Sequence, residues 1–338
     1  MRALVTGGGG FLGKRIVELL LAEGHEVRFL ARNRYPEVEA LGARAWAADL
    51  RQASALEDAV RGVEVVFHVA GKAGFWGSRA EYFSINADGT ANLLEAARAA
   101  GVKRFVYTST PSVIGYGADA CGLSEAPYPA EHLSFYPESK AAAERMVLAA
   151  NGPDLVTVSL RPHLIFGPGD PHLLPNVVHA AKVGRMAIIG DGANTVDLTY
   201  VDNAAWAHLD AERALAGGAP CAGRAYFISN GEPVRLWDWL NQLLPRVGAG
   251  TISRRLSLKA ATRIGAVMEW MWRALPLRGE PRMTRFLASA FARSHWYDMG
   301  PAARDLGYRA RVPMAEATDR TVAWFLQQGG GRGEGRSR

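Results

Sequence analysis

The sequence predicts an α/β protein in which a doubly wound parallel sheet is followed by a smaller, mostly helical C-terminal domain. A glycine-rich turn stands between a short apolar strand and a helix at the start of the chain. Short apolar runs then alternate with helical segments as far as about residue 160, which is typical of a parallel sheet covered by helices on both faces. Beyond residue 235 the pattern is mostly helical.

The composition is that of a globular protein with a hydrophobic core. Of the 338 residues, 49% are hydrophobic and 21% are charged, and the length favours a main domain plus a smaller one. The two cysteines, Cys121 and Cys221, have neither a disulfide nor a metal-ligand spacing, so we expect no metal and a reducing, cytoplasmic location. No signal peptide is visible, and every apolar run is shorter than the roughly 18 residues that a membrane span needs.

Positive charge is concentrated in the last quarter of the chain. Residues 250–338 contain 16 Lys and Arg against 7 Asp and Glu, which leaves the first 249 residues with a net charge of −3. A well-solvated arginine-rich surface explains this distribution. The alternatives are a site for an anionic substrate, a lipid surface or an acidic partner protein. We expect no nucleic-acid partner, because no recognition motif accompanies the charge.

The first elements surround a glycine loop. Residues 2–6 are expected to form a strand, 14–23 a helix and 26–30 a second strand. In this context the spacing G-x-x-G-x-x-G indicates a dinucleotide-binding turn, because glycine lets the backbone approach a pyrophosphate at the helix N-terminus. The glycines are Gly7, Gly10 and Gly13.

The end of the second strand indicates which dinucleotide binds. An acidic residue there hydrogen-bonds the ribose of NAD, whereas an arginine accommodates the 2′-phosphate of NADP. The chain has no acid at this point and reads Ala31-Arg32-Asn33-Arg34. Arg32, alone or with Arg34, is therefore predicted to pair with the phosphate, and the expected cofactor is NADPH.

The alternation continues, and a late strand returns to the sheet. Further strands are expected at residues 43–47, 63–69, 104–109 and 154–160. We expect residues 1–165 to form the NADP-binding domain, with a strand at 225–229 rejoining it, and residues 166–328 to form the substrate domain. The polar, glycine-rich residues 329–338 are expected to be a disordered tail.

A tyrosine and a lysine stand four residues apart at the start of an alanine-rich helix. Tyr136 and Lys140 are therefore expected on one face of that helix. A nearby ammonium group lowers the pKa of a phenol from its usual value of about 10, which suits such a pair to proton transfer in carbonyl chemistry. Taken alone, the spacing is equally compatible with a chance pair on a helix surface.

Together these features resemble the extended short-chain dehydrogenase/reductase superfamily, which has a Rossmann fold. The motifs, in order, are T-G-x-x-G-x-x-G from Thr6, Asp49-Leu50, N-x-x-G-T from Asn86, the hydroxyl run ending at Thr110, Y-x-x-x-K from Tyr136, Arg161-Pro162 with Gly167-Pro168, and Tyr200-Val201-Asp202-Asn203. The resemblance implies catalytic roles for Tyr136, Lys140, Thr110 and Asn86. It implies cofactor contacts from Gly7, Gly10, Phe11, Leu12, Gly13, Arg32, Asp49, Leu50, Ala70, Lys140 and Pro162.

The implied catalytic roles follow the chemistry of ketone reduction. Tyr136 is expected to give a proton to the ketone oxygen, and Thr110, where many relatives have serine, to donate a second hydrogen bond to it. Lys140 is expected to hold the nicotinamide ribose and to lower the pKa of Tyr136. Asn86 is expected to support the site through backbone and water contacts or to be purely structural.

Within this superfamily the chain resembles the 3β-hydroxysteroid and sterol-carboxylate dehydrogenase branch, and more closely the 2-alkyl-3-oxoalkanoate reductases of bacterial long-chain olefin (β-lactone) biosynthesis. The segments that carry this resemblance are residues 71–78, 108–113, 226–233 and 277–281. The implied reaction is the NADPH-dependent reduction of a long-chain 2-alkyl-3-oxo acid to a 2-alkyl-3-hydroxyalkanoate. The implied partners are a ligase that closes the product to a β-lactone and a decarboxylase. A homodimer and a membrane-surface contact are left open.

Two other functions are weighed against this one. A 3β-hydroxysteroid or sterol-4-carboxylate 3-dehydrogenase would use the same residues in the oxidative direction, and Arg32 argues against it because oxidation in cells usually draws on NAD. A catalytically silent dinucleotide-binding regulator or scaffold typically lacks one of the catalytic positions. Here the tyrosine, lysine and hydroxyl positions are all present.

Residues 257–275 are expected to form a helix that contributes to a site for the two alkyl tails, with ordinary core packing as the alternative. Trp270 falls outside the apolar face and among basic residues, which suits a membrane interface, a partner protein or a substrate lid. Lys72 is a candidate for binding the substrate carboxylate, and a solvated loop lysine is the alternative. The apolar positions are Leu258, Ala261, Ile264, Met268, Met271, Trp272 and Leu275.

Overall fold

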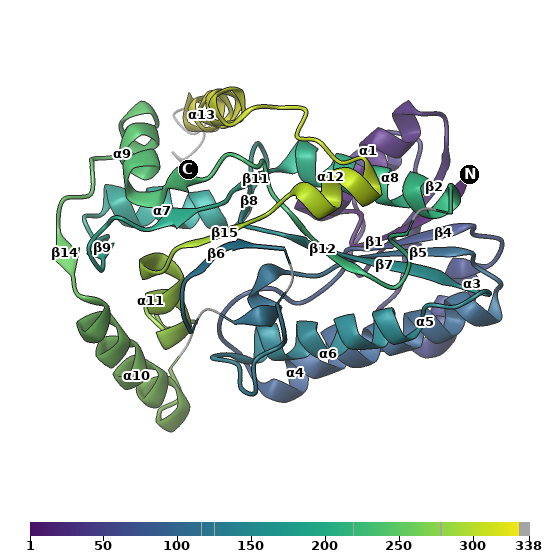
Figure 1. Ribbon diagram of the computed structural model, residues 1–338, viewed down its shortest axis with the longest axis horizontal. Helices are drawn as coiled ribbons and strands as arrows, with labels where there is room; N and C mark the ends of the chain where they lie inside the picture. Colours follow the sequence, from purple (N-terminus) through teal and green to yellow (C-terminus); the bar gives the residue numbers. More distant parts are fainter. Residues whose placement is uncertain (116, 125, 219, 278, 331–338) are drawn as a thin grey trace, which may run out of the picture.

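The computed structural model describes residues 1–115, 117–124, 126–218, 220–277 and 279–330. A seven-stranded sheet lies at its centre in the order β12-β7-β5-β4-β1-β2-β3, and each neighbouring pair of strands is parallel (Figure 1). The expected doubly wound α/β fold is confirmed. The strands are β1 (Arg2–Thr6), β2 (Glu26–Ala31), β3 (Arg44–Ala47), β4 (Val65–His68), β5 (Arg104–Thr108), β7 (Val156–Pro162) and β12 (Ala225–Ile228).

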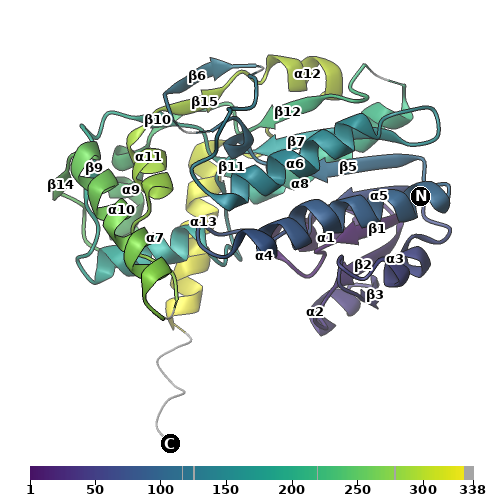
Figure 2. The same cartoon turned by 90° about the horizontal axis from the view of Figure 1, so that it is seen from below.

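Helices cover both faces of this sheet and give the main part of the molecule three layers (Figure 1), one of which faces the viewer in Figure 2. On one face α1 and α8 pack against each other, and α12 packs on α8 and β12. On the other face α3, α5 and α6 lie side by side. The helices are α1 (Phe11–Ala22), α3 (Ala53–Val60), α5 (Gly89–Ala99), α6 (Phe135–Ala149), α8 (Val201–Ala216) and α12 (Gly300–Leu306), with the short α2 (Pro36–Glu39) after β2.

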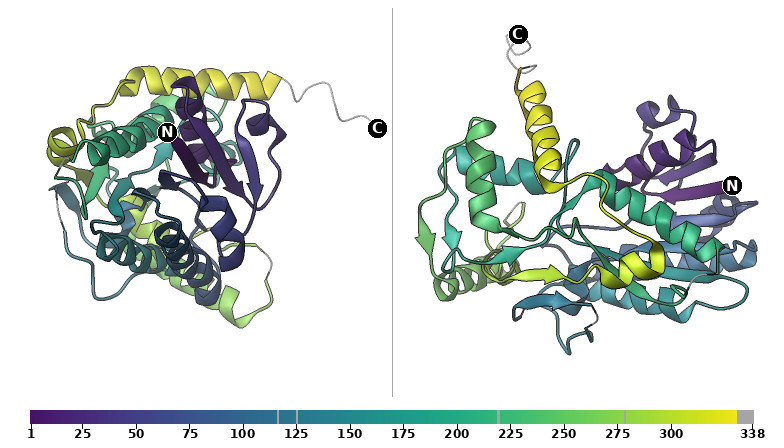
Figure 3. Two further views of the ribbon diagram at one scale, coloured as in Figure 1. Left: turned by 90° about the vertical axis from the view of Figure 1, so that its right-hand side faces the viewer. Right: turned by 45° about the horizontal axis from the view of Figure 1, so that its top comes forward.

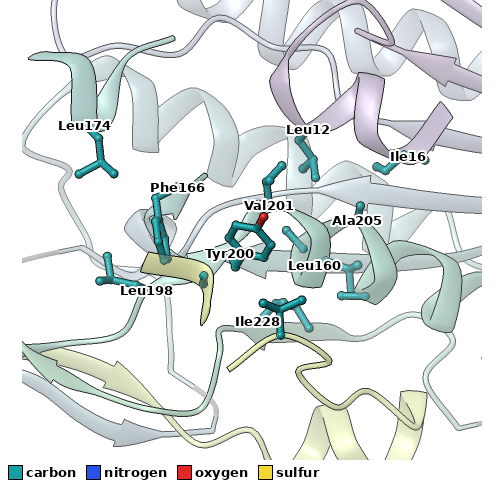
Figure 4. Close-up of a cluster of buried hydrophobic side chains, with 14 of the residues drawn as sticks. Leu12, Ile16, Leu160, Phe166, Leu174, Leu198, Tyr200, Val201, Ala205 and Ile228 are labelled. Atoms are coloured by element: carbon teal, nitrogen blue, oxygen red, sulfur yellow. The ribbon is translucent and has the colours of Figure 1, made fainter. Parts of the chain in front are cut away.

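The apolar strands bury side chains on both faces of the sheet. Successive strand residues point to opposite faces, so Val5 belongs to the core under α1 and α8 whereas Leu4 belongs to the core under α3, α5 and α6. Figure 4 shows part of the first core, where Leu12 and Ile16 of α1 lie near Ala205 of α8. Each fully buried leucine or valine stabilises the fold by about 1.5–3 kcal/mol relative to an exposed one.

The C-terminal part is less helical than expected, because three small sheets run through it. A four-stranded sheet has the order β13-β10-β15-β6, and two further pairs are β11-β8 and β14-β9. These strands have two to four residues each, too few for a recognisable alternating pattern. They are β6 (Ala120–Leu123), β8 (Ile165–Phe166), β9 (Ile188–Ile189), β10 (Thr195–Val196), β11 (Thr199–Tyr200), β13 (Val234–Arg235), β14 (Arg255–Leu256) and β15 (His295–Tyr297). The helices are α7 (Leu173–Lys182), α9 (Leu236–Arg246), α10 (Leu258–Ala274), α11 (Arg285–Ala292) and α13 (Met314–Gly330).

The chain passes between its two parts more often than a single boundary near residue 165 allows. The strand expected at 225–229 is β12, which pairs with β7 at the edge of the large sheet. Helix α8, expected in the substrate domain, packs on β5 and β7 instead. In the other direction β6 leaves the N-terminal part and pairs with β15. The chain returns to the large sheet because α8 has a buried face that completes the core on that side of the sheet.

The end of the chain differs in part from the expected tail. Helix α13 runs along the outside of the molecule and continues to Gly330, two residues into the segment expected to be disordered (Figure 3). The rest of that segment, residues 331–338, lies outside the described residues. Within the described ranges no helix is long and apolar enough to cross a bilayer, and no group of three His, Cys, Asp or Glu side chains is placed to hold a metal.

Candidate active site

Tyr136 and Lys140 lie one turn apart near the start of α6, as their spacing predicts. Ser134 is the N-cap of α6, with φ −154° and ψ 165°. The helix packs against the segment that follows β5. Lys140 is 5% exposed and points beneath β5, where its Nζ donates to the backbone oxygen of Thr108 at 2.6 Å. Its ammonium also lies 4.2 Å from the centre of the Tyr107 ring. The pair therefore faces the carboxyl edge of the parallel sheet, where doubly wound folds bind ligands.

Thr110 lies beside Tyr136, near the end of β5. It follows β5 directly and caps the short 3₁₀ helix η2 (Pro111–Ile114), accepting from the backbone N–H of Ser112. Burial raises the pKa of Tyr136, and a hydrogen bond with Thr110 partly offsets that rise. The structure thus joins the two hydroxyl groups that were expected to share a ketone oxygen.

The expected influence of Lys140 on Tyr136 requires correction. The residue that lowers the pKa of Tyr136 is Thr110, and the net shift of that pKa is upward because burial dominates. Burial also lowers the pKa of Lys140 from 10.5 to about 7, against an opposing effect of Glu144. Desolvation disfavours the charged form of each group, so a phenol becomes harder to ionise and an ammonium easier to deprotonate. Burial thus makes Lys140 less basic than a lysine in water, with its pKa lowered toward neutrality.

A buried ion pair that the sequence analysis did not identify lies one turn beyond Lys140. Glu144 is fully buried and accepts two hydrogen bonds from Nε of Arg161 and one, at 2.6 Å, from its Nη2. It also accepts from Ser159 Oγ and Tyr128 Oη, both at 2.7 Å. Its position four residues after Lys140 was a usable signal, because i and i+4 share a helix face. Arg161, expected only as part of a turn motif, is its partner.

Asn86 ties the loop after β4 to α6. It lies in a π-helical turn, η1 (Ser84–Asp88), which follows α4 (Arg79–Phe83). Its Nδ2 donates to Lys72 O at 3.1 Å and to Ser139 Oγ at 2.9 Å, and its Oδ1 accepts from the backbone N–H of Lys72 at 2.7 Å. Both amide hydrogens are thus used within the protein. Of the two expected roles, the structural one fits these contacts.

The glycine loop has the geometry that a pyrophosphate requires. Gly7 has φ +69°, and a Cβ there would lie 3.0 Å from the backbone of Ala70. A Cβ at Gly13 would lie 2.1 Å from the carbonyl oxygen of Gly7, so only glycine lets α1 start this close to β1. Gly10, the N-cap of α1, provides no side-chain cap for the first N–H groups of the helix. Free N–H groups at a helix N-terminus fit a diphosphate.

The residues expected at the adenosine end gather beside the ends of β2 and β3. Arg32 follows β2, is exposed, and has no ion-pair partner among the residues described, whereas Arg34 lies 3.6 Å from Glu39. Asp49 follows β3, and hydrogen bonds from Arg51 lower its pKa to about 2, with a smaller contribution from Arg32. Arg32 is thus the guanidinium here that is left available for a phosphate.

The remaining expected cofactor residues line the same edge of the sheet. Phe11 and Leu12 are the first two residues of α1, and Pro162 is the last residue of β7. Leu50 packs closely on the start of α5: a Cβ added at Gly89 would lie only 2.8 Å from the Cβ of Leu50. His68, for which no role was expected from sequence, joins Thr6 Oγ1 (2.7 Å) to Thr90 Oγ1 (2.9 Å). Burial lowers the pKa of His68 to about 3, so this link from β1 to α5 is neutral.

A cavity of about 460 Å³ is walled by both parts of the molecule, and its lining includes Phe135 but not Tyr136. Its aromatic wall includes Phe75 and Phe286, whose rings stack at 5.2 Å. Tyr82 also lines the cavity, and its ring lies 6.3 Å from that of Tyr136. Two buried polar atoms of the lining, His132 Nδ1 and Ser134 Oγ, have no hydrogen-bond partner among the described residues. An aromatic cavity with unsatisfied polar groups suits an amphipathic ligand.

The cavity wall also carries more positive than negative charge. Glu269 of α10 is 3% exposed and accepts from Arg285 Nε at 3.0 Å, with Nη2 of Arg285 at 2.9 Å. Arg273 lies 3.7 Å from the same carboxylate and 5.4 Å from the centre of the Trp76 ring. One carboxylate thus faces two guanidinium groups. Lys72, the candidate from sequence, is instead paired with Glu81 at 3.0 Å.

Comparison with known proteins gives these features a context. A family model described as the 3-beta hydroxysteroid dehydrogenase/isomerase family matches residues 4–259. The chain is 48% identical over 326 residues to a 2-alkyl-3-oxoalkanoate reductase of Stenotrophomonas maltophilia, covering 96% of this chain and 99% of that one. It is 44% identical over 330 residues to a 2-alkyl-3-oxoalkanoate reductase of Shewanella oneidensis, covering 95% and 85%. Among solved structures it is similar to MoeE5 in complex with UDP-glucose and NAD, with a TM-score of 0.75, 27% identity and coverage of 97% and 99%.

Proposed function

This chain belongs to the 3-beta hydroxysteroid dehydrogenase/isomerase family and is an oxidoreductase of the extended short-chain dehydrogenase/reductase type; on that premise, we propose that it reduces the 3-keto group of a 2-alkyl-3-oxoalkanoate with NADPH. The observation that carries the choice of substrate is the likeness over nearly the whole chain to relatives named for this reaction. The paired hydroxyls of Tyr136 and Thr110 beside an aromatic, basic cavity support it.

The residues at the sheet edge divide the work of ketone reduction. The nicotinamide ring, when bound, supplies the hydride that reaches C3. Tyr136 donates a hydrogen bond to the ketone oxygen and transfers its proton as negative charge develops there. Thr110 donates the second hydrogen bond. Lys140, whose pKa burial lowers to about 7, would supply the proton that restores the phenol and would hold the ribose hydroxyls of the cofactor.

The residues of the glycine loop would hold the pyrophosphate, and Arg32 would hold the 2′-phosphate of NADPH. Replacement of Arg32 by serine is expected to raise the KM for NADPH about 10- to 100-fold, because a charge-assisted hydrogen bond contributes about 1.5–3 kcal/mol. The KM for NADH should hardly change. Steady-state kinetics with both cofactors measures the ratio. Arg34→Ser is the matched control, since Arg34 is paired with Glu39; an equal effect of the two variants would contradict the assignment.

The cavity beside Tyr136 would hold one alkyl tail and the carboxylate of the substrate. Arg273 is the guanidinium less firmly held by Glu269, because Arg285 lies closer to that carboxylate. Arg273→Met is expected to raise the KM for a 2-alkyl-3-oxo acid about tenfold or more, with no comparable change for a ketone that lacks a carboxylate. Initial rates with both substrates measure this. If Lys72→Met raised this KM and Arg273→Met did not, the substrate carboxylate would be assigned to Lys72 in the loop after β4 instead.

A panel of substrates tests the function itself. NADPH consumption is expected with 2-alkyl-3-oxo acids, with a kcat/KM well above that for simple ketones and for steroid ketones. The alternative, a 3β-hydroxysteroid or sterol-4-carboxylate 3-dehydrogenase, is favoured by the family description and by relatives of lower identity that carry these names. Oxidation of a steroid alcohol with NAD, together with no turnover of the oxo acids, would overturn the proposed function in favour of that alternative.

The chemistry of the product constrains the next reaction in a sequence. A 2-alkyl-3-hydroxyalkanoate carries a carboxylate and a β-hydroxyl, the two groups that a β-lactone-forming ligase joins. We therefore expect such a ligase, and after it a decarboxylase, to act on this product. Independently of this chemistry, we propose that the chain forms a homodimer. Pull-down with the ligase and sedimentation velocity of the isolated chain measure these two expectations.

A further inference from the structure

Helix α10 presents an apolar face to solvent. Ile264, Val267 and Trp270 are 43%, 57% and 66% exposed, and Leu275 just after the helix is 47% exposed. Of the expected apolar face, Ile264 and Leu275 are exposed, whereas the other positions, Leu258, Ala261, Met268, Met271 and Trp272, are buried or half-buried. The buried residues of α10 are Ala261, Gly265 and Glu269. The helix lies at the edge of the molecule remote from the N-terminus (Figures 1 and 2).

Close packing against α11 fixes this orientation. A Cβ at Gly265 would lie 2.7 Å from the backbone carbon of Thr284 and 2.8 Å from the backbone nitrogen of Arg285, so α10 and α11 approach as closely as glycine permits. Ala261 is fully buried on the same side, and Glu269 accepts a hydrogen bond from the N–H of Arg285 at 2.7 Å. With 261, 265 and 269 inward, positions 263, 267, 270 and 274 must face outward.

The exposed face is framed by positive charge. In the sequence, residues 254–293 contain nine Lys and Arg against two Glu, a net charge of +7. Lys259 and Arg263 are exposed on α10 itself, and Arg273 is 58% exposed by its side chain. Of the two acids, Glu269 is buried against Arg285. The surface that solvent meets is therefore tryptophan and aliphatic groups surrounded by cations.

We propose that α10 docks this protein on an anionic lipid surface, with Val267 and Trp270 entering the interface and Lys259 and Arg263 contacting the headgroups. A basic helix with a tryptophan on its apolar face matches the composition of helices that lie in the plane of a membrane surface. Anionic headgroups supply the complementary charge. A second copy of this chain does not, because two copies meeting at α10 would bring like charges together.

The proposed docking places a membrane next to the cavity. Glu269 and Arg273 line that cavity from the inner side of α10, while Val267 and Trp270 face outward from the same two turns. A long-chain ligand that leaves a bilayer at this helix would therefore reach the cavity across the width of one helix. The docking itself does not depend on which substrate is turned over.

Vesicle sedimentation tests the proposal with the full chain. Wild-type protein is expected to sediment with phosphatidylcholine vesicles that contain phosphatidylglycerol, and at least about fivefold less with phosphatidylcholine alone. Val267→Ser/Trp270→Ser and Arg263→Glu should each lower binding about fivefold or more. Raising the ionic strength from about 0.1 M to 1 M, which shortens the Debye length from about 10 Å to 3 Å, should lower it as well.

Matched variants elsewhere on the surface separate docking from general stickiness. Leu326 of α13 is 57% exposed, like Val267, and Lys103 is an exposed lysine of the loop before β5. Leu326→Ser and Lys103→Glu should bind vesicles like wild type, and thermal unfolding should show all variants folded. Equal binding by wild type and the double variant, or a dimer in sedimentation velocity that the double variant abolishes without any lipid binding, would overturn the proposal.

Discussion

Replacement of Tyr136 by phenylalanine is expected to lower kcat by about 10²- to 10⁴-fold, the usual contribution of a positioned proton donor. The hydroxyl is the only group removed, and the Thr110 hydroxyl that bonds to it in this structure remains. Binding of NADPH should be retained, because the glycine loop and Arg32 are untouched. Stopped-flow or steady-state turnover of a 2-alkyl-3-oxo acid, with NADPH titrated by fluorescence, measures the two effects separately.

The control for this experiment removes a buried phenolic hydroxyl that lies outside the site. Tyr226 of β12 donates from its hydroxyl to Asp305 at 2.9 Å, so Tyr226→Phe loses a comparable hydrogen bond. We expect it to cost stability and to leave kcat close to that of wild type. Near-normal turnover by Tyr136→Phe would show that another group supplies the proton.

Replacement of Glu144 by glutamine is expected to destabilise the fold by about 3–5 kcal/mol, because it leaves the buried guanidinium of Arg161 without its counter-charge. That is a large part of the 5–15 kcal/mol that stabilises a typical domain. Burial alone would raise the pKa of Glu144, but the hydrogen bonds from Arg161 outweigh it and the pKa is lowered. A carboxyl group whose pKa is lower in the folded state than in the unfolded state stabilises the fold at pH values above the unfolded-state pKa. This stabilisation is lost as the pH falls through the folded-state pKa. The difference between wild type and variant should therefore shrink in acid, as urea unfolding at several pH values would show.

Glu144→Gln should also change the pH dependence of turnover. The charge of Glu144 raises the pKa of Lys140, against burial that lowers it to about 7. Loss of that charge should move the decline in kcat/KM that accompanies deprotonation of Lys140 to lower pH. Tyr128→Phe removes one hydrogen bond from Glu144 and keeps the charge, so it should be milder and leave the pH profile in place. If the pH profile of Glu144→Gln were identical to that of wild type, the charge of Glu144 would not control the pKa of Lys140.

Much of the fold could be read from local patterns. The strand at residues 2–6, the glycines at 7, 10 and 13 and the alternation as far as β7 specify a parallel sheet, because each depends on residues close together in sequence. The C-terminal part could not be read in this way. Its strands have only two to four residues, and β6 of the N-terminal part pairs with β15 of the C-terminal part across more than 170 positions. Such pairings between distant segments depend on which surfaces are still exposed after the large sheet and its helices have packed.

The residues of the candidate site also differ in whether local sequence patterns could predict them. Tyr136 and Lys140 were predictable because a helix brings i and i+4 together, and Arg32 because it ends a strand. Three other contacts join residues from separate elements. They are the pair of Glu144 with Arg161, the hydrogen bond of His68 with Thr6, and the pair of Glu269 with Arg285. Five of the seven apolar positions expected on one face of α10 are buried or half-buried, and Trp270 is exposed as expected. Ile264 and Leu275 are exposed as well, because the contact with α11 is made at the small Gly265.

The sequence by itself determined the class of fold and the position of the glycine loop, and it indicated Tyr136 as the candidate proton donor, because these depend on short-range spacing and on the geometry of single elements. Only the tertiary structure decided the charge states around that donor. Burial raises the pKa of Tyr136 and lowers that of Lys140, and burial is a property of the whole packed molecule. It likewise decided which side of α10 faces water.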